Sequence, residues 1–282
     1  FMVSRRQSLT FLTGTMLLAG CASPPEKPRT YVLVHGAWHG GWEWEKVVPL
    51  LERAGARVFA PTLKGLAERQ NENGPDVTLT THIEEVVELL NKHQLDDVIL
   101  VGHSYAGFVI TGVCDRSAER IGQVVYLDAF VPSDGQKLYD LVQPAARAEN
   151  MRKQVIEKGE GYKSLPPDAA IWGLSGHLAD EVNRRMTPQP ANTFEERITL
   201  RRGGPYVVPK RTYIGCQQPA MPAFIEVKAR VRVDPRWRFV PLAAGHEVGA
   251  DSSRIAGYHA GRSFASVELF QGRRSPRALP PA

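Results

Sequence analysis

The sequence predicts an α/β fold in which helices flank a mainly parallel β-sheet. Short apolar, β-branched segments alternate with segments of helical periodicity along most of the 282 residues. This alternation is typical of right-handed crossovers between parallel strands, whose carboxyl ends meet at one edge of the sheet. A hydrophobic content of 43% is enough for one domain with a sizeable core and an insertion. Four polar residues follow predicted strands: His35, Ser104, Asp128 and His246.

Six segments have the pattern of buried strands, and each is short, apolar and closed by a glycine, a proline or a polar residue. They are residues 31–34, 57–60, 98–101, 124–127, 211–216 and 237–243. Helices are expected at residues 42–54, 81–93, 105–115 and 220–229, followed by a short terminal helix. Thr80 or Thr81 with Glu84 forms a plausible capping box for the second helix.

Residues 133–208 interrupt this alternation, because they are long, mixed in pattern and broken by several prolines. We expect them to form a helical cap over the edge of the sheet. The core then comprises residues 30–132 and 209–262, and residues 263–282 hold the end of the terminal helix and a disordered tail.

The first residues are typical of an export signal. Arg5 and Arg6 precede an apolar stretch, and Leu18-Ala19-Gly20-Cys21 resembles a bacterial lipobox. This predicts a signal peptide of the lipoprotein type over residues 1–20, lipidation of Cys21 and a tether over residues 21–29. The protein would be anchored to a membrane of the bacterial cell envelope on the periplasmic side, with a secreted form as the alternative. The apolar stretch is too short to favour a transmembrane helix, and export by the Sec or the Tat route stays open.

The formal net charge of +5 does not indicate a nucleic-acid partner. The excess lies in the leader and the tail, so residues 21–270 are formally neutral. The arginines concerned are Arg5, Arg6, Arg273, Arg274 and Arg277. Cys114 and Cys216 lie in apolar segments without metal-ligand spacing, which favours buried free thiols.

The segment Gly102-His103-Ser104-Tyr105-Ala106-Gly107 is the most informative stretch of the chain. It joins a buried strand to a helix through a turn in which only small neighbours allow the two backbones to approach. The common pattern is G-x-S-x-G, and in this chain Ala106 replaces the last glycine of the pattern. Ser104 at the apex is therefore a candidate nucleophile, with an ordinary turn serine as the alternative.

A serine nucleophile needs a base, and His246 is the strongest candidate among the eight histidines. It follows the last strand, and Gly245 allows its loop to fold back over Ser104. We expect the His103 side chain to point away from the apex and His35 to shape the backbone of a glycine-rich loop. Four other histidines are expected mostly at the surface or in loops: His39, His82, His93 and His177.

An oxyanion needs two preorganised backbone N–H donors. Tyr105 provides one at the start of a helix. Gly36 allows the backbone of Ala37 to provide the other, and Gly40 and Gly41 keep that loop compact.

Three motifs in this order resemble the α/β-hydrolase superfamily: Val34-His35-Gly36-Ala37-Trp38-His39-Gly40-Gly41-Trp42, Gly102–Gly107 and Gly245-His246. The likeness covers about residues 30–262 and is strongest to small esterases related to plant methylesterases and hydroxynitrile lyases. It implies an α/β-hydrolase fold and acyl-transfer chemistry.

The acid of the triad departs from this resemblance. Relatives usually carry it just after the strand equivalent to residues 212–216, where this chain has Gln217. Asp128 ends the preceding strand and is our candidate, with a purely structural role in the following turn as the alternative. Asp234 and Asp251 are more distant candidates.

These features predict a serine carboxylic-ester hydrolase that forms an acyl-enzyme on small to medium hydrophobic esters, without a metal or cofactor. A hydroxynitrile lyase is disfavoured, because Glu247 follows His246 and no lysine occurs after Lys228. A cofactor-free dioxygenase and a non-catalytic ligand-binding lipoprotein stay open, as does the oligomeric state. The candidate pocket residues are Trp38, Tyr105, Phe130, Leu138, Tyr162, Trp172 and Leu174.

Overall fold

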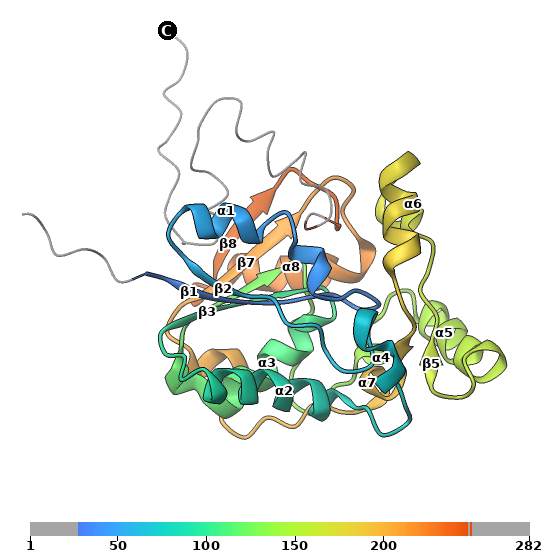
Figure 1. Cartoon of the computed structure of the whole chain (residues 1–282), viewed down its shortest axis with the longest axis horizontal. Helices are drawn as coiled ribbons and strands as arrows, with labels where there is room; N and C mark the ends of the chain where they lie inside the picture. The colour runs from blue at the N-terminus through green and yellow to red at the C-terminus, as the bar shows by residue number, and fades with distance from the viewer. Residues whose placement is uncertain (1–27, 248, 250–282) are drawn as a thin grey trace, which may run out of the picture.

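The computed structural model describes residues 28–247 and Gly249, and within them a six-stranded parallel sheet forms the centre of the molecule (Figure 1). The strand order is β2-β1-β3-β4-β7-β8, and every neighbouring pair is parallel. The strands are β1 (Thr30–Val34), β2 (Arg57–Phe59), β3 (Val98–His103), β4 (Ile121–Leu127), β7 (Arg211–Cys216) and β8 (Arg238–Leu242). The fold class and all six predicted strands are confirmed.

The helices that join these strands are α1 (Val48–Arg53), α2 (Leu79–Lys92), α3 (Ala106–Ser117) and α8 (Ile225–Val233). The helix expected at residues 42–54 is divided into the 3-10 turn η1 (Gly41–Trp44) and α1, because Pro49 lies in the first turn of α1 and cannot donate a helical hydrogen bond. The expected cap of α2 was also wrong. Thr78 is the N-cap, and it exchanges side-chain and backbone hydrogen bonds with Thr81 rather than with Glu84.

Two apolar clusters hold the sheet between helices. Val32 and Val34 of β1 belong to the larger cluster, which α2, α3 and α8 complete. Tyr31 and Leu33 belong to the opposite cluster, which η1 and α1 cover. Since successive side chains of a strand point to opposite faces, both faces of the central strands are apolar and buried, as expected for a parallel sheet.

Residues 133–208 lie beside the sheet rather than within it, and they carry most of the helices on the right of Figure 1. They contain α4 (Leu138–Leu141), α5 (Ala145–Lys158), η4 (Ala169–Trp172), α6 (Gly176–Arg185), α7 (Asn192–Glu195) and the two-stranded antiparallel pair β5 (Lys163–Ser164) and β6 (Gln189–Pro190). Glu196 fixes this insertion to the start of α2 by accepting bonds from the Thr80 backbone and hydroxyl at 2.7 and 2.8 Å. The remaining short turns of the chain are η2 (Ala67–Glu72), η3 (Ala118–Arg120), η5 (Gly204–Val207) and η6 (Pro222–Phe224).

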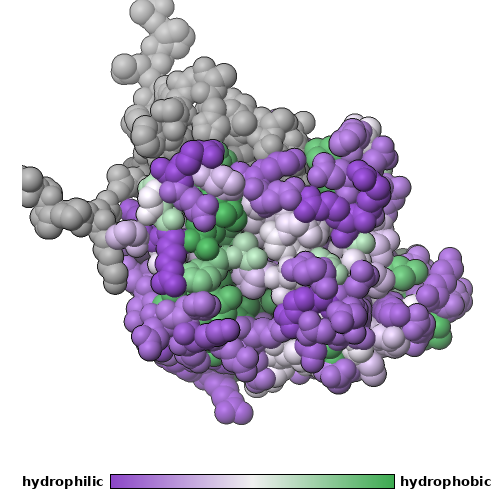
Figure 2. All heavy atoms as spheres, in the orientation of Figure 1, coloured by the Kyte–Doolittle hydropathy of each residue, from purple (hydrophilic) through white to green (hydrophobic). Residues whose placement is uncertain are grey.

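Several predicted features lie outside the described residues: the signal peptide, Cys21, most of the tether, Asp251, the terminal helix and the tail. Within residues 28–247, no helix has the length and apolar character needed to cross a membrane. The face shown in Figure 2 is hydrophilic over most of its area, because the helices that cover the sheet direct many charged side chains outward.

Candidate active site

Ser104 lies at a strained turn between β3 and α3. Its φ angle is +53°, a conformation that non-glycine residues rarely adopt. The turn is fixed because the Ser104 carbonyl accepts hydrogen bonds from the N–H groups of Gly107 at 3.1 Å and Phe130 at 3.2 Å. A Cβ atom on Gly107 would lie 1.9 Å from the Phe130 carbonyl oxygen, so only glycine fits there. This geometry presents the Ser104 hydroxyl above the carboxyl edge of the sheet.

Ser104, His246 and Asp128 form a continuous hydrogen-bonded chain, although they come from three separate loops. Ser104 Oγ lies 3.1 Å from His246 Nε2, and His246 Nδ1 lies 2.8 Å from Asp128 Oδ2. The His246 and Asp128 side chains are buried. Because Nδ1 donates to the carboxylate, Nε2 is left to accept the Ser104 proton. The arrangement is that of a nucleophile, a base and an orienting acid.

His246 is held in the neutral form that a base requires. Burial lowers its pKa, and the positive charge on neighbouring His103 lowers it further, while the hydrogen bond to Asp128 acts in the opposite direction. The two histidine rings lie 4.5 Å apart between centroids.

Lys228 of α8 and the backbone of Cys216 orient the Asp128 carboxylate. Asp128 Oδ1 accepts a hydrogen bond from the Cys216 N–H at 3.0 Å and lies 2.6 Å from Lys228 Nζ. Lys228 also donates to the Cys216 carbonyl at 2.6 Å. Burial acts to raise the pKa of Asp128, but His246 and Lys228 outweigh it, so the pKa is lowered and the acid stays ionised. One carboxylate oxygen is thereby fixed, and the other faces His246.

The position after β7 provides no competing acid. The Gln217 side chain turns back and donates to the carbonyl of Gly215 at 2.9 Å. Asp234 pairs with Arg236 at 2.7 Å, away from His246. Asp251 lies outside the described residues.

The loop after β1 leaves the Ala37 N–H without a hydrogen-bond partner in the described part of the chain. The Gly36 N–H donates to Glu43 at 2.7 Å, and the Trp38 N–H donates to Gln189 of β6 at 3.0 Å. In the described part of the chain, neither the Ala37 N–H between them nor the Tyr105 N–H before α3 makes a hydrogen bond. Ala37 and Tyr105 are the two donors that were expected from the sequence.

Two buried histidine–glutamate pairs lie near His246, and neither was expected from the sequence. His103 Nδ1 lies 2.7 Å from Glu43, and His39 Nε2 lies 3.1 Å from Glu247. Neither ring N–H is well aligned with its carboxylate oxygen, so these contacts are ion pairs rather than directional hydrogen bonds.

The second nitrogen of each ring faces a carbonyl oxygen. His103 Nε2 lies 3.0 Å from the His246 carbonyl oxygen, and His39 Nδ1 lies 2.7 Å from the Ala37 carbonyl oxygen. Since both nitrogens of each ring face acceptors, both rings are imidazolium ions. Burial disfavours this charge, but the Glu247 carboxylate outweighs it and raises the pKa of His39 to about 9. His103 therefore links the carbonyl of His246 to Glu43 of η1, and His39 links the carbonyl of Ala37 to Glu247.

Two further histidines are structural and neutral. His35 donates to its neighbour's carbonyl and accepts the Leu63 N–H at 3.0 Å, which agrees with the backbone-shaping role expected for it. His82 was expected at the surface but is fully buried, where it contacts the Tyr105 hydroxyl at 3.0 Å. Burial lowers the pKa of His35 to about 4 and that of His82 to about 3.

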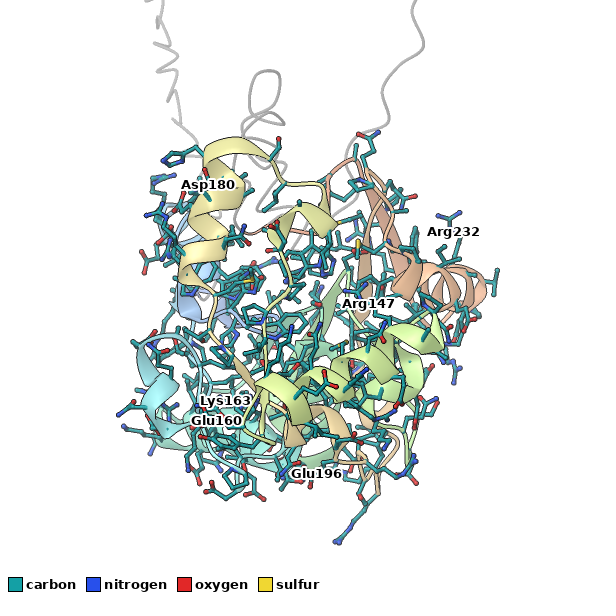
Figure 3. The ribbon with its side chains drawn as sticks, turned by 90° about the vertical axis from the view of Figure 1, so that its right-hand side faces the viewer. Arg147, Glu160, Lys163, Asp180, Glu196 and Arg232 are labelled. Atoms are coloured by element: carbon teal, nitrogen blue, oxygen red, sulfur yellow. The ribbon has the colours of Figure 1, made fainter. Side chains whose placement is uncertain are left out.

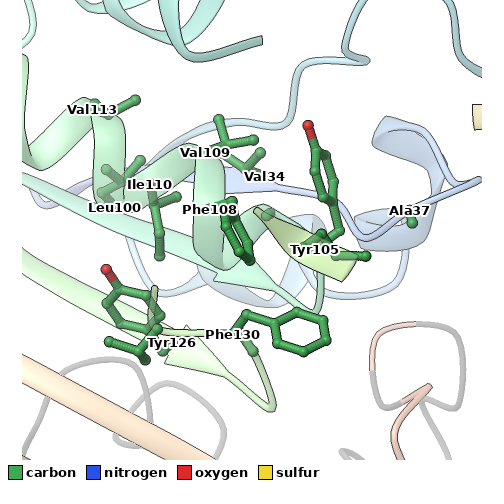
Figure 4. Close-up of a cluster of buried hydrophobic side chains, with 14 of the residues drawn as sticks. Val34, Ala37, Leu100, Tyr105, Phe108, Val109, Ile110, Val113, Tyr126 and Phe130 are labelled. Carbon is green, nitrogen blue, oxygen red and sulfur yellow. The ribbon is translucent and has the colours of Figure 1, made fainter. Parts of the chain in front are cut away.

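A narrow pocket opens beside Ser104 and His246, with a cavity volume of about 60 Å³. Apolar side chains dominate its walls, and Figure 4 shows two of them, Tyr105 and Phe130, beside the buried residues of α3. Five of the seven predicted residues line it: Trp38, Tyr105, Phe130, Leu138 and Trp172. Tyr162 and Leu174 do not line this pocket, because both lie elsewhere in the insertion. Within residues 28–247, no group of three or more His, Cys, Asp or Glu side chains is arranged to hold a metal ion. Cys114 and Cys216 are buried free thiols, as expected.

Residues 31–258 match the sequence model of the alpha/beta hydrolase family. The chain belongs to this family. This alpha/beta hydrolase is 40% identical over 228 residues to the carbendazim hydrolyzing esterase of Nocardioides sp. (strain SG-4G), a match that covers 78% of this chain and 93% of the relative. It is 33% identical over 187 residues to putative methylesterase 14 of Arabidopsis thaliana, covering 61% of this chain and about half, 53%, of the plant protein.

Among solved structures, the hydrolase is similar to an extracellular alpha/beta-hydrolase from a Paenibacillus species, with a TM-score of 0.71 and 24% identity over 82% of this chain and 97% of the other. A tomato methylketone synthase I also matches, with a TM-score of 0.65 and 16% identity over 83% of this chain and 96% of the other. At these identities the structural likeness establishes the fold.

Proposed function

We propose that this hydrolase is a serine carboxylesterase that acts through an acyl-enzyme. The observation that carries the proposal is the hydrogen-bonded chain from Ser104 through His246 to Asp128, beside the two uncommitted N–H groups of Ala37 and Tyr105. A hydroxyl next to a neutral, oriented imidazole is activated as a nucleophile, and paired N–H donors stabilise a developing oxyanion.

In the first half-reaction, His246 Nε2 takes the Ser104 proton while Oγ bonds to the ester carbonyl carbon. The N–H groups of Ala37 and Tyr105 hold the resulting oxyanion. The C–O bond to the alcohol then breaks, and the alkoxide leaves with the proton carried by His246. In the second half-reaction, water attacks the acyl-enzyme with the same base, and the carboxylic acid and free Ser104 are released.

The substrates are small to medium esters with an apolar group. The pocket is narrow and lined mostly by apolar side chains, which suits an apolar acyl or alcohol group. Two relatives support ester hydrolysis, since one is a carbendazim hydrolyzing esterase and the other a putative methylesterase. A lyase is less well supported, since the residue after His246 is Glu247, which is buried and paired with His39.

The test is the loss of both covalent labelling and turnover in Ser104→Ala. The wild type is expected to hydrolyse p-nitrophenyl butyrate and to react with a fluorophosphonate probe at Ser104, as located by peptide mass spectrometry. Ser104→Ala should lose at least about 10³-fold in kcat/KM and all labelling. Ser133→Ala, which changes an exposed serine outside the pocket, is the matched control. A folded wild type that neither turns over esters nor takes up the probe would favour the ligand-binding interpretation.

We also propose that the protein is exported and anchored by a lipid on Cys21. The support is the order of Arg5 and Arg6, an apolar stretch and Leu18-Ala19-Gly20-Cys21 in the sequence. In a bacterial host, the wild type should fractionate with membranes and incorporate labelled palmitate, whereas Cys21→Ala should do neither. Equal palmitate incorporation by the two would contradict the anchor.

A further inference from the structure

Arg147 is a charged residue in the wall of the otherwise largely apolar pocket. It lies in the first turn of α5, and its side chain lines the cavity that also contains Ser104 and His246. Figure 3 shows this side of the molecule and labels Arg147 on α5. The neighbouring wall is built from apolar residues: Leu138, Val142, Met151, Met221 and Ala223.

Within residues 28–247, the Arg147 guanidinium has no ion pair and no side-chain hydrogen bond, although it is half-buried. Arg152, on the same helix, shows the usual arrangement, since it pairs with Glu195 at 2.7 Å, and that contact raises its pKa. Burial alone lowers the pKa of Arg147, and no carboxylate offsets it. A guanidinium that gives up part of its hydration without gaining a partner costs free energy, and an anionic ligand in the pocket would offset this cost.

We propose that Arg147 binds a carboxylate on the substrate, and that the preferred substrates are esters with a free carboxylate on the part away from the reacting carbonyl. The inference rests on the proposed function and specifies its substrate class. A guanidinium presents N–H groups in a fork that fits a carboxylate in two parallel hydrogen bonds. The apolar residues beside Arg147 contact the carbon chain between the two ends of the substrate and exclude water from the pair. Half-esters of dicarboxylic acids have this chemistry.

The experiment compares each half-ester with its neutral amide. The monomethyl esters of succinic, glutaric and adipic acids vary the distance between the ends, and the methyl esters of the corresponding monoamides match them in shape without the charge. Each is assayed with the wild type, Arg147→Met and Arg147→Lys. Lys153→Met is the control, since Lys153 lies on the same helix but is exposed and pairs with Glu157.

For the best chain length, the wild type should prefer the half-ester over the amide. Arg147→Met should lose at least about tenfold in kcat/KM on the half-ester and less than about twofold on the amide. Arg147→Lys should retain an intermediate preference, and Lys153→Met should match the wild type. An equal effect of Arg147→Met on both substrates, or a preference for neutral aromatic esters that depends on Arg147, would overturn the proposal.

Binding to Ser104→Ala separates this proposal from the proposed function. Calorimetry should detect the half-ester on Ser104→Ala and not on Ser104→Ala with Arg147→Met. If the wild type hydrolyses no ester but this binding difference is present, the esterase proposal fails and the carboxylate site stands. If p-nitrophenyl butyrate is hydrolysed at Ser104 without any binding difference, the carboxylate site fails and the esterase stands.

Discussion

Asp128, the proposed triad acid, lies one strand away from the usual position, and its neighbours explain how this position would work. It ends β4, which lies between β3 with Ser104 and β7, whose end holds Gln217 in place of a carboxylate. Its φ of +41° and the bond from its N–H to the Ile214 carbonyl at 2.7 Å turn the side chain over β7 toward His246. The Cys216 N–H and Lys228 then hold the carboxylate from the far side. A structural role alone does not require the 2.8 Å contact with His246.

We predict that Lys228 acts on catalysis through Asp128. Asp128→Asn should lower kcat by about 10³- to 10⁴-fold, because an amide does not fix the tautomer or stabilise the imidazolium. Lys228→Met should lower kcat/KM by about 10- to 100-fold, the equivalent of the roughly 1.5–3 kcal/mol that a hydrogen bond to a charged group contributes. Steady-state kinetics on p-nitrophenyl butyrate measure both.

The double variant isolates this role from a loss of packing. If Lys228 works only by orienting Asp128, Lys228→Met should lower kcat/KM only slightly when Asp128→Asn is already present. The same 10-fold or larger loss in both backgrounds would show that Lys228 acts independently of the acid. Circular dichroism and thermal unfolding confirm that each variant is folded.

Local sequence patterns predicted the strands, the helices and the candidate residues that these elements carry. They did not predict the contacts between segments that are far apart in the sequence. Ser104 was selected from the sequence because a strand, a turn and a helix adjoin in ten residues, and His246 because Gly245 precedes it at a strand end. Lys228 left no such signal, since a lysine on a short helix is ordinarily exposed. Its burial depends on how α8 packs on β7 and β8. The Trp38 contact with Gln189 likewise joins residues 151 positions apart.

In the strained turn between β3 and α3, we predict that Gly107 is far less replaceable than Ala106. Gly107→Ala places a methyl group 1.9 Å from the Phe130 carbonyl, so β4's end or α3 must shift. Overpacking of this kind costs roughly 1–3 kcal/mol, and here it also displaces Asp128 and lowers kcat. Ala106→Gly restores the common G-x-S-x-G pattern. It should lower the free energy of unfolding by about 1 kcal/mol or less and change kcat little. Urea unfolding and ester kinetics compare the two variants, and equal losses would contradict this account of the turn.

At the scale of the whole molecule, the sheet gathers an unusual set of buried histidines in two opposite charge states. The alternation of strands and helices predicted that His35, Ser104, Asp128 and His246 would meet at one edge, and they do so because all six strands are parallel. Their protonation could not be predicted, because it depends on partners contributed by distant segments. His35 and His82 are neutral, whereas His39 and His103 are charged beside glutamates.

These opposite states predict a stability maximum near pH 6.5, the ordinary pKa of histidine. As the pH falls from 6.5 toward about 4 for His35 and about 3 for His82, the unfolded chain binds protons that the folded chain does not, so stability is lost. As the pH rises from 6.5 toward about 9, the folded chain keeps the His39 proton that the unfolded chain releases, so stability is lost again. Each group contributes a slope of roughly 1.4 kcal/mol per pH unit within its range.

Urea unfolding from pH 5 to 8.5 tests this profile, and the alkaline limb is compared between pH 6.5 and 7.5, because unfolded thiols ionise near pH 8.5. His82→Gln, whose amide can accept from Tyr105 and donate to the Lys64 carbonyl, should flatten only the acidic limb. His39→Gln combined with Glu247→Gln removes the ion pair without leaving an unpaired charge and should flatten only the alkaline limb. A stability that rises steadily to pH 8.5, or limbs that neither variant alters, would show that these buried histidines do not govern the pH dependence. The two variants thus test whether the neutral His82 causes the acidic limb and whether the charged His39 causes the alkaline limb.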